Sequence, residues 1–587
     1  MENLWDRIRQ LKITGKLPNK REIEGALSSF SKKEWLAFYA LALVLFVSTT
    51  AILQNINKSF MVEVPFSGGE IFEGIVGTPR FINPVLAFSD ADRDLAILVY
   101  SGLMRKSPNG TLIPDLALKY EVSKDGLTYT FTLKDKIFFQ DGEPVSVKDV
   151  FFTINKIKDP IIKSPRRGNW DGVSIEIIDN KNIKFTLKQP YASFLENMTL
   201  GIMPEHLWSD SPIELSDRNI NPIGSGPYSI ISINKQSGGI IDSYEFESFD
   251  QFALGKPYIK KLTLRFFPNE EDLILAFQNK EVDQISSIAP ANAIVLKENG
   301  YRVESSVLPR IFGLFFNQNQ NQIFTDKNII KAIDLAIDKD RIVRVVLEGY
   351  GIAIDEPIPP KMIQYQKLKK GNEVSYEDRS AEAREILVKN GWKAGTDGFL
   401  EKTTTVQKKK TTKFLEFSIS TGNAPELVKS AEMIKEDLEA IGMKVTIKTF
   451  EVGNLNQSVI RPRKYDVLLF GQIINHESDL YAFWHSSQRN DPGLNVAMYT
   501  NAKVDKILED AFITTDEAAR IKKYAQFEDE IKKDMPAVFL YSPNFIYVIK
   551  EDLRGFSLDH IASTADRFIN IYSWYSETND VWKIFTK

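Results

Sequence analysis

Residues 127–157 read LTYTFTLKDKIFFQDGEPVSVKDVFFTINKI, and this stretch decides the fold. Apolar residues alternate with threonines from Leu127 to Leu133, which is the period of a strand with one buried face. Asp141-Gly142 then indicates a turn, because glycine accepts a positive φ at little cost. The sequence therefore predicts a half-buried strand followed by a tight turn.

A capped helix is predicted after the turn. Ser146 stands three residues before Asp149, which is the spacing of a capping box. Apolar residues then recur at helical spacing, at Val150, Phe151, Ile154 and Ile157. Turn and cap account for the acidic residues, so nothing here indicates catalysis. The information lies in the order of strand, turn and capped helix.

This order, with its residues, resembles the diagnostic segment of bacterial extracellular solute-binding proteins of family 5, the oligopeptide- and dipeptide-binding type. Members typically show the pattern DGLTYTFxL followed by FxDGxPxtAxDV, which residues 125–131, 139–142 and 148–150 match. The resemblance covers roughly residues 69–575. It implies an α/β, two-lobed periplasmic-binding-protein-like fold of type II with an extra inserted subdomain.

The resemblance also implies boundaries for the two lobes. The first lobe would comprise residues 69–310 and 540–587, with the inserted subdomain at about 105–210. The second lobe would comprise residues 311–539. The chain would cross between the lobes at these two boundaries, and the crossings would act as a hinge that closes over a ligand.

A candidate membrane span precedes the lobes. The chain carries no charge from Trp35 to Leu53, and at about 1.5 Å per residue this run reaches about 28 Å, close to the thickness of a hydrocarbon core. Residues 1–34 are rich in Lys and Arg, so the positive-inside rule places them in the cytoplasm. We therefore expect a basic cytoplasmic segment (1–34), a transmembrane helix (35–54), a linker (55–68) and lobes on the extracellular or periplasmic side of the cell membrane.

A cleavable signal peptide is the alternative for this segment. Thr49-Thr50-Ala51 resembles the small-residue site at which signal peptides are cut. The basic segment before the apolar run is longer than a signal peptide usually carries, which favours an uncleaved anchor. A mature protein whose sequence starts near Ile52 would contradict the anchor.

Composition excludes several classes of protein. The formal net charge is −4, so no strongly basic surface indicates nucleic acid. The sequence has no cysteine, which excludes disulfides, thiolate metal sites, cysteine nucleophiles and a lipid-modified N-terminal cysteine. It also has no HExxH, P-loop, Rossmann or GxSxG pattern. We expect no enzyme, cofactor or metal site, although a catalytic triad assembled from distant residues stays open.

Three short motifs extend the family resemblance to the expected ligand site. Residues 81–84 read FINP and resemble a motif at the mouth of the family's cleft, residues 221–228 resemble PxGTGPY, and residues 314–317 resemble a hinge strand. The ligand-binding residues implied there are Asn83, Pro84, Phe88, Ser225, Gly226, Phe316 and Asn317. A simple turn is an equally good interpretation of Asn83-Pro84.

A fourth motif, NHESDLYAFW at residues 475–484, follows a predicted buried strand. A carboxylate can pair with the α-ammonium of a peptide, and aromatic faces can cover its apolar side chains. The resemblance implies ligand-binding roles for Asn475, Glu477, Asp479 and Trp484. The family's leading Asp, which holds the ammonium, is Asn475 here, so a free peptide N-terminus would bind more weakly. A solvated acidic loop is the alternative interpretation.

The resulting expectation is a monomeric, membrane-tethered receptor that delivers oligopeptides to the permease and ATPase subunits of an ABC importer. A sensory or cell-wall-peptide receptor that is not coupled to import is the second hypothesis, and a hydrolase is the third. Relatives in the family also bind nickel complexes, sugars and opines, so other small solutes stay open.

Overall fold

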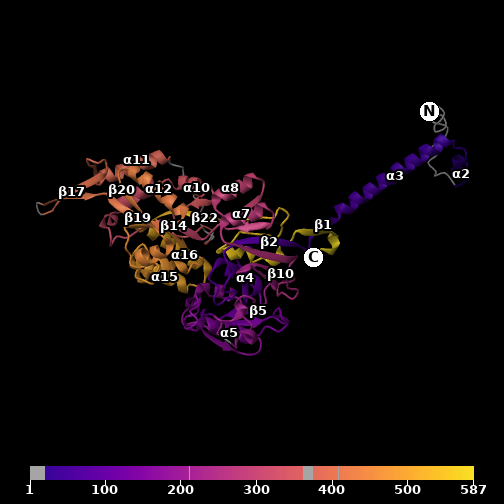
Figure 1. The fold of residues 1–587 in the computed structure, drawn as a ribbon, viewed down its shortest axis with the longest axis horizontal. Coiled ribbons are helices and arrows are strands. Elements are labelled where there is room, and N and C mark those ends of the chain that lie inside the picture. Colours follow the sequence, from indigo (N-terminus) through magenta and orange to yellow (C-terminus); the bar gives the residue numbers. More distant parts are fainter. Residues whose placement is uncertain (1–19, 211, 361, 363–374, 407–408, 587) are drawn as a thin grey trace. The chain divides into compact units, whose positions relative to one another are not determined.

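The structure, a computed structural model, describes residues 20–210, 212–360, 362, 375–406 and 409–586. The chain divides into two compact units, residues 67–577 and residues 1–66 with 578–587. Figure 1 gives the order of the elements along the chain. Residues 1–19 of the expected cytoplasmic segment lie outside the described residues.

The smaller unit is built on one long apolar helix. Its elements are α2 (Lys20–Ser28), α3 (Lys32–Ser59), β1 (Met61–Phe66), β23 (Glu577–Trp582) and the 3₁₀ turn η9 (Lys583–Phe585). In the part of the chain that the structure describes, α3 is the one helix long and apolar enough to cross a membrane, and none of its side chains is buried. The segment 55–68, expected to be a linker, instead contains the end of α3 and strand β1, which pairs with β23.

The larger unit contains one mixed sheet of twelve strands, and the half of the sheet around β2 defines the first lobe. The strands of this half are β2 (Gly68–Val76), β9 (Tyr228–Lys235), β10 (Ile241–Ser248), β11 (Ile259–Phe267), β12 (Gln284–Ser286) and β13 (Arg302–Val307). Its helices include α4 (Asp90–Val99), α7 (Glu270–Gln278) and α8 (Pro290–Glu298). Strand β2 is parallel to both of its neighbours, β11 and β12, an arrangement that needs crossover connections.

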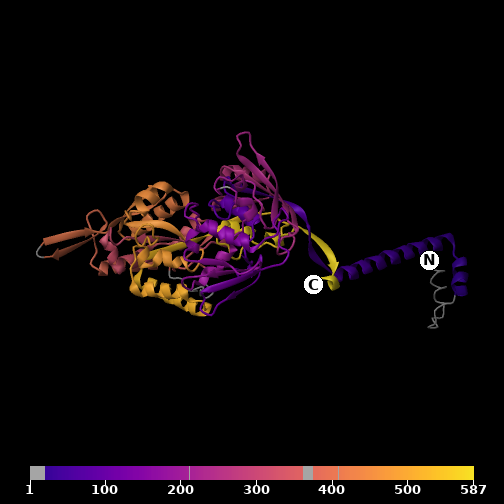
Figure 2. The same ribbon diagram turned by 90° about the horizontal axis from the view of Figure 1, so that it is seen from below.

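The other half of the sheet defines the second lobe. Its strands are β14 (Arg310–Phe316), β15 (Gly351–Ala353), β19 (Glu416–Gly422), β20 (Lys444–Phe450) and β21 (Val467–Ile473). Its helices include α9 (Lys327–Ala336), α10 (Lys339–Val346), α11 (Tyr376–Lys389), α12 (Pro425–Ala440), α14 (Asp479–Trp484), α15 (Ala502–Ile513) and α16 (Glu517–Asp534). The hairpin of β17 (Leu400–Val406) and β18 (Lys409–Phe414) projects from this lobe, as the orange ribbon in Figure 2 shows.

The alternating apolar residues of β14 explain why helices cover both faces of the second half-sheet. Leu314 and Phe316 pack in one core cluster with α9 to α12, whereas Ile311 and Phe315 pack in another with α14 to α16. Successive side chains of a strand point to opposite faces, so each face buries its own set. Figure 1 shows α10, α11 and α12 on one side of these strands and α15 and α16 on the other.

One long strand, β22 (Ala537–Ile549), belongs to both lobes. Its first part, from Ala537 to Tyr541, pairs with β14 of the second lobe. Its last part, from Asn544 to Ile549, pairs with β13 of the first lobe. Strands β13 and β14 are joined by residues 308–309, so the chain crosses between the lobes at two neighbouring places.

A second, smaller sheet extends the first lobe. Its strands follow the order β5 (Ala117–Val122), β6 (Thr128–Leu133), β8 (Asn182–Thr186) and β7 (Ser174–Ile177), and α5 (Val147–Lys158) belongs to the same subdomain. Strand β6 and helix α5 are the strand and helix predicted from residues 127–157. Ser146 and Asp149 form the predicted capping box, in which the Asp149 carboxylate accepts the Ser146 backbone N–H at 2.8 Å.

Candidate ligand-binding cleft

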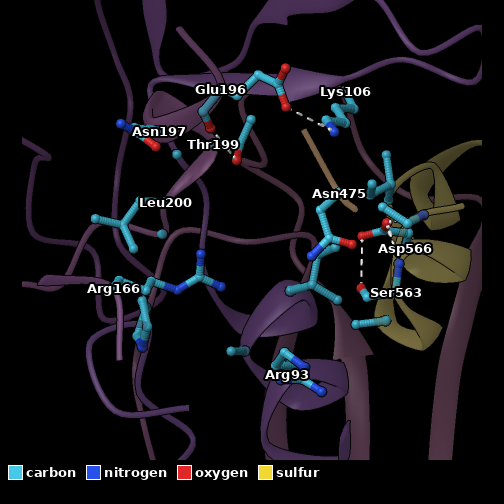
Figure 3. Close-up of a pocket in the computed structure, with 18 of the residues that line it drawn as sticks. Arg93, Lys106, Arg166, Glu196, Asn197, Thr199, Leu200, Asn475, Ser563 and Asp566 are labelled. Atoms are coloured by element: carbon cyan, nitrogen blue, oxygen red, sulfur yellow. Dashed lines mark hydrogen bonds and ion pairs between the residues drawn. The ribbon is translucent and has the colours of Figure 1, made fainter. Parts of the chain in front are cut away.

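A cavity of about 380 Å³ is lined by residues of both lobes. The polar residues that the first lobe contributes include Asp90, Arg93, Arg105, Lys106, Asp115, Arg166, Glu196, Asn197, Ser563 and Asp566. The second lobe contributes Arg310, Ile473, Asn475 and His476, which lie at the start of β14, at the end of β21 and directly after it. Figure 3 shows Arg93, Arg166, Glu196 and Asn475 around the same space.

Most charges in the cavity wall already have protein partners. Arg93 pairs with Asp90 on the same helix, and the Arg105 Nε lies 2.7 Å from Asp115 Oδ2. The remaining acidic residues of the wall are also engaged. Lys106 Nζ lies 3.4 Å from Glu196 Oε2, and Asp566 accepts the backbone N–H groups of Ala562 and Ser563 at 2.8 and 2.9 Å.

Glu196 also joins the two lobes. It lies in the 3₁₀ helix η2 (Ala192–Thr199) of the first lobe, and its carboxylate contacts Nδ1 of His476 from the second lobe. Burial opposes ionisation of Glu196, but the hydrogen bond and charge of His476 outweigh it and hold the pKa of this carboxyl below its ordinary value. The contact is therefore between a carboxylate and an imidazole on opposite walls of the cavity.

Arg166 and Arg310 differ from the other charges, because neither side chain has a hydrogen-bond or ion-pair partner among the described residues. Arg166 is exposed, and Arg310 is half-buried. Partial removal from bulk water lowers the pKa of both guanidinium groups, and the positive charge of Arg93 also lowers it. The negative charges of Asp566 near Arg166 and of Asp90 near Arg310 only partly oppose this shift. Arginine nevertheless stays protonated in proteins, so the cavity holds two permanent cations available to a ligand.

The four ligand-binding residues predicted between positions 475 and 484 lie in different environments. Asn475 lines the cavity. The Asp479 carboxylate accepts the backbone N–H groups of Asn475 and His476 at 2.9 and 3.0 Å, and the Glu477 carboxylate lies 2.5 Å from the Arg520 Nε. Trp484 is fully buried in the core of the second lobe. Of the four, Asn475 alone is in the cavity lining, while Asp479 holds the backbone of that wall, Glu477 pairs with Arg520 and Trp484 packs in the core.

Residues of the earlier motifs lie mostly in tight packing around the cavity wall. Pro84 lines the cavity, whereas Asn83 is buried and its Oδ1 accepts the Val85 N–H at 2.8 Å. Phe88 is 76% exposed, and its carbonyl accepts a hydrogen bond from Arg93. These three residues thus share one loop, but Pro84 alone of them reaches the lining.

The Gly-rich motif and the hinge-strand motif serve packing in this structure. Gly226 donates its N–H to the Val99 carbonyl at 2.7 Å, and a Cβ at this position would lie 2.5 Å from the Leu98 carbonyl oxygen. Its neighbour Ser225 is also buried, and Phe316 belongs to the core cluster of the second lobe. Asn317 donates from its side chain to the Arg463 carbonyl at 2.8 Å, so it holds a loop in place. None of these four residues is in the cavity lining.

Sequence reasoning missed Arg93, Arg166, Glu196, Arg310 and His476, which form the charged part of the wall. They belong to different elements, and no local spacing links them. The double arginine in KSPRRGNW, residues 163–170, was the one local signal, since two adjacent cations in a loop have no helical partner. Among the described residues, no group of three or more His, Asp or Glu side chains could hold a metal ion.

The fold and the cleft are those of a class of protein with two lobes and a cavity between them. The chain belongs to the bacterial extracellular solute-binding proteins, family 5, because the model of that family's middle region matches residues 111–492. The resemblance first seen in residues 127–157 is confirmed.

Curated relatives are similar to this chain over most of its length. The oligopeptide-binding protein AppA of Bacillus subtilis is 26% identical over 528 residues, which cover 88% of this chain and 94% of that protein. The glutathione-binding protein GsiB of Escherichia coli K12 is 24% identical over 521 residues, covering 86% of this chain and 94% of its own.

Solved structures agree with the fold. AppA from B. subtilis in complex with a nonapeptide has a TM-score of 0.65 at 26% identity, covering 87% of this chain and 99% of that one. NikZ from Campylobacter jejuni in complex with Ni(L-His) has a TM-score of 0.67 at 27% identity, covering 86% of this chain and 99% of NikZ. The α/β, two-lobed binding-protein class is thereby confirmed, and the chain is a solute-binding protein of the kind that serves ABC importers. The family and these relatives are binding proteins, not enzymes.

Proposed function

We propose that this chain is a membrane-anchored receptor that captures an oligopeptide between its lobes and passes it to the permease of an ABC importer. In this proposal α3 stays uncleaved as a single membrane span, with the basic residues before it in the cytoplasm. The exposed apolar surface of α3 supports a span, and Lys32 and Lys33 at its start support the orientation. Receptor, permease and ATPase would then act at one membrane, with the receptor as a monomer.

The observation that carries the binding role is the cavity lined by both lobes beside the two chain crossings. Residues 308–309 and the middle of β22 are short connections, and we propose that they are the hinge. Small backbone rotations at two neighbouring connections would open and close the cavity without disturbing either core. The lobes proposed from the sequence, 69–310 with 540–587 and 311–539, meet at these connections, although residues 578–587 belong to the smaller unit.

The charges of the cavity favour a ligand that presents carboxylates. Arg166 and Arg310 are cations without a protein partner among the described residues, whereas the acidic residues of the wall are engaged. Guanidinium groups bind carboxylates through paired, charge-assisted hydrogen bonds. At the place where the family holds a peptide ammonium, Asn475 supplies a neutral amide. We therefore propose a peptide held chiefly by its C-terminal carboxylate or by acidic side chains.

Calorimetry on the full chain in nanodiscs tests this proposal. The panel contains short peptides of equal length that are acidic or neutral, each with a free or an amidated C-terminus. We expect the acidic peptide with a free C-terminus to bind most tightly and to add about 2.7 kcal/mol to the free energy of unfolding at 100 times its Kd. A panel in which no peptide binds contradicts the peptide assignment. Equal binding of free and amidated forms contradicts the role of the arginines.

A further inference from the structure

The chain returns to the outer end of α3 after the lobes are complete. Strand β23 pairs with β1, and the backbone N–H of Lys583 donates to the Phe60 carbonyl at 2.9 Å. Phe60 is the residue that caps the C-terminal end of α3. The turn η9, residues Lys583–Phe585, is therefore fixed beside the end of the proposed membrane span by backbone hydrogen bonding.

This turn carries large apolar side chains that nothing in the described residues covers. Trp582 is 47% exposed, Ile584 is 77% exposed and Phe585 is 74% exposed. Phe60, which accepts the hydrogen bond from the turn, is 60% exposed. Single exposed apolar residues are ordinary on a protein surface, but a contiguous set of this size marks an interaction surface. Trp and Phe are also residues that favour the boundary between lipid and water.

The length of α3 sets the level of this surface relative to a bilayer. The apolar run ends at Leu53, and Phe60, the C-cap residue of α3, follows seven residues later. At 1.5 Å per residue this places Phe60 about 10 Å beyond the apolar run. The headgroup region on one side of a bilayer is about 5–8 Å thick. Phe60 and η9 thus lie a few ångströms outside the headgroup layer, a gap that side chains as long as Trp582 and Phe585 can span.

We propose that Trp582, Ile584 and Phe585, together with Phe60, dock into the outer headgroup layer of the bilayer that α3 crosses. Lys58 and Lys583 are exposed on the same part of the chain, and lipid phosphates would pair with them. This inference rests on the proposed anchor, since a cleaved helix would remove the reference to the bilayer. The docked turn gives the chain a second contact with the membrane, which restrains the tilt of the strand pair β1 and β23.

Fluorescence quenching by lipid nitroxides tests the docking, and the absence of cysteine from the sequence makes single-site labelling clean. Full-chain variants Ile584→Cys, Phe585→Cys, Leu43→Cys and Asn579→Cys are labelled with an environment-sensitive dye. They are placed in nanodiscs of phosphatidylcholine and phosphatidylglycerol, with nitroxide in either the headgroup or the acyl chain. Leu43 lies inside the proposed span, and the exposed Asn579 precedes Trp582 on β23, farther from α3.

We expect the dye at 584 and at 585 to lose most of its emission with headgroup nitroxide, while the dye at 579 keeps its emission. The dye at 43 should be quenched by acyl-chain nitroxide. If 43 is quenched but 584 and 585 behave like 579, the docking is overturned and the anchor stands. If 43 is not quenched either, the anchor itself fails. Quenching at both 43 and 584 supports the anchor and the docking together.

Discussion

The first lobe handles arginine in two opposite ways. Arg567 lies in its core with no exposed surface, and its Nε and Nη2 each lie 2.7 Å from a carboxylate oxygen, of Glu73 and Asp94 respectively. The Tyr547 hydroxyl donates to the same Glu73 at 2.6 Å. Arg166, in contrast, reaches into the cavity with no ion-pair partner among the described residues. Arg567 is thus neutralised by carboxylates inside the fold, whereas the charge of Arg166 stays available to a ligand.

The difference shows how a binding protein divides its charges between stability and function. A buried ion pair contributes little net stability over an apolar substitute, but loss of one partner leaves an uncompensated charge and is strongly destabilising. An arginine without an ion-pair partner in a cavity adds no ion-pair energy to the free energy of folding. A carboxylate ligand that binds it forms a charge-assisted hydrogen bond, which adds to the free energy of binding. Substitution of the two kinds of arginine should therefore affect different measurements.

The largest effect should come from Arg567→Met, which breaks the closed network. Glu73 and Asp94 would stay buried without their cation, so we expect the free energy of unfolding to fall by about 3–5 kcal/mol. Urea denaturation of the full chain, followed by tryptophan fluorescence, measures this loss. Lys413→Met, at an exposed position of β18, is the matched control and should change stability by less than about 0.5 kcal/mol.

The pH dependence of the same variant sharpens the prediction. Burial raises the pKa of Glu73 and of Asp94, although Arg567 opposes the shift. When the folded pKa of a carboxyl group lies above its unfolded pKa, the free energy of unfolding of the protein falls as the pH rises through the folded pKa. Removal of Arg567 raises the folded pKa values of both carboxyl groups further. The loss in free energy of unfolding relative to wild type should therefore be largest at neutral pH and smaller in mild acid. A defect that grows in acid would contradict this account of the network.

The next largest effect should appear in binding and leave stability almost unchanged. Arg166→Gln and Arg310→Gln each remove one charge-assisted bond to a carboxylate ligand, worth about 1.5–3 kcal/mol, or roughly a 10- to 150-fold rise in Kd. Because neither arginine has a partner to lose, the free energy of unfolding without ligand should change by less than about 0.5 kcal/mol. Calorimetry with the acidic peptide and urea denaturation measure the two quantities.

Two outcomes would break the comparison for these variants. A loss of stability as large as that of Arg567→Met would mean that Arg166 or Arg310 is structural. An unchanged Kd for every acidic peptide would mean that the ligand avoids them. Lys413→Gln serves again as the control, because it removes a cation at an exposed position of the β17–β18 hairpin.

Local patterns in the sequence predicted the elements well where short-range chemistry decides them. Strand β6 follows from the alternation between Leu127 and Leu133, and the start of α5 follows from Ser146 and Asp149, whose contact is made within four residues. The uncharged run inside α3 is read from composition alone. In each case the interaction that fixes the element lies inside the stretch that was read.

The cleft could not be predicted in the same way, because its wall is assembled by the crossings of the chain. Arg166 lies in a loop after α5 and Arg310 begins β14, and they meet only through the packing of the two lobes. Motif residues such as Gly226 stand out in the sequence, yet the close backbone approach to Leu98 accounts for that glycine. Asn475 was the exception, since the family resemblance of the motif after a predicted buried strand implied a ligand-binding role for it, and it lies in the cavity lining.

Glu196 and His476 form a case between the two kinds of arginine, because they are paired but across the cavity. Neighbouring contacts also join the lobes here, since Tyr191 stacks on Phe512 with ring centres 4.8 Å apart and its hydroxyl lies 3.3 Å from the Ser478 hydroxyl. Glu196→Gln should therefore weaken the closed arrangement only slightly, by up to about 1 kcal/mol, since both side chains keep some exposure.

The pH profile of Glu196→Gln should reveal this small effect. The pKa of Glu196 is held below its ordinary value, so the pair stabilises the protein above the unfolded pKa and is lost as the pH falls through the folded pKa. The difference in Tm between wild type and variant should be present at neutral pH and vanish in acid. Glu432→Gln, at an exposed position of α12 without an ion-pair partner among the described residues, is the control and should show no such difference. A difference in Tm that persists in acid would mean that the Glu196 side chain acts by packing and not by charge. The pair could then be compared neither with the buried ion pairs of Arg567 nor with the unpaired charge of Arg166.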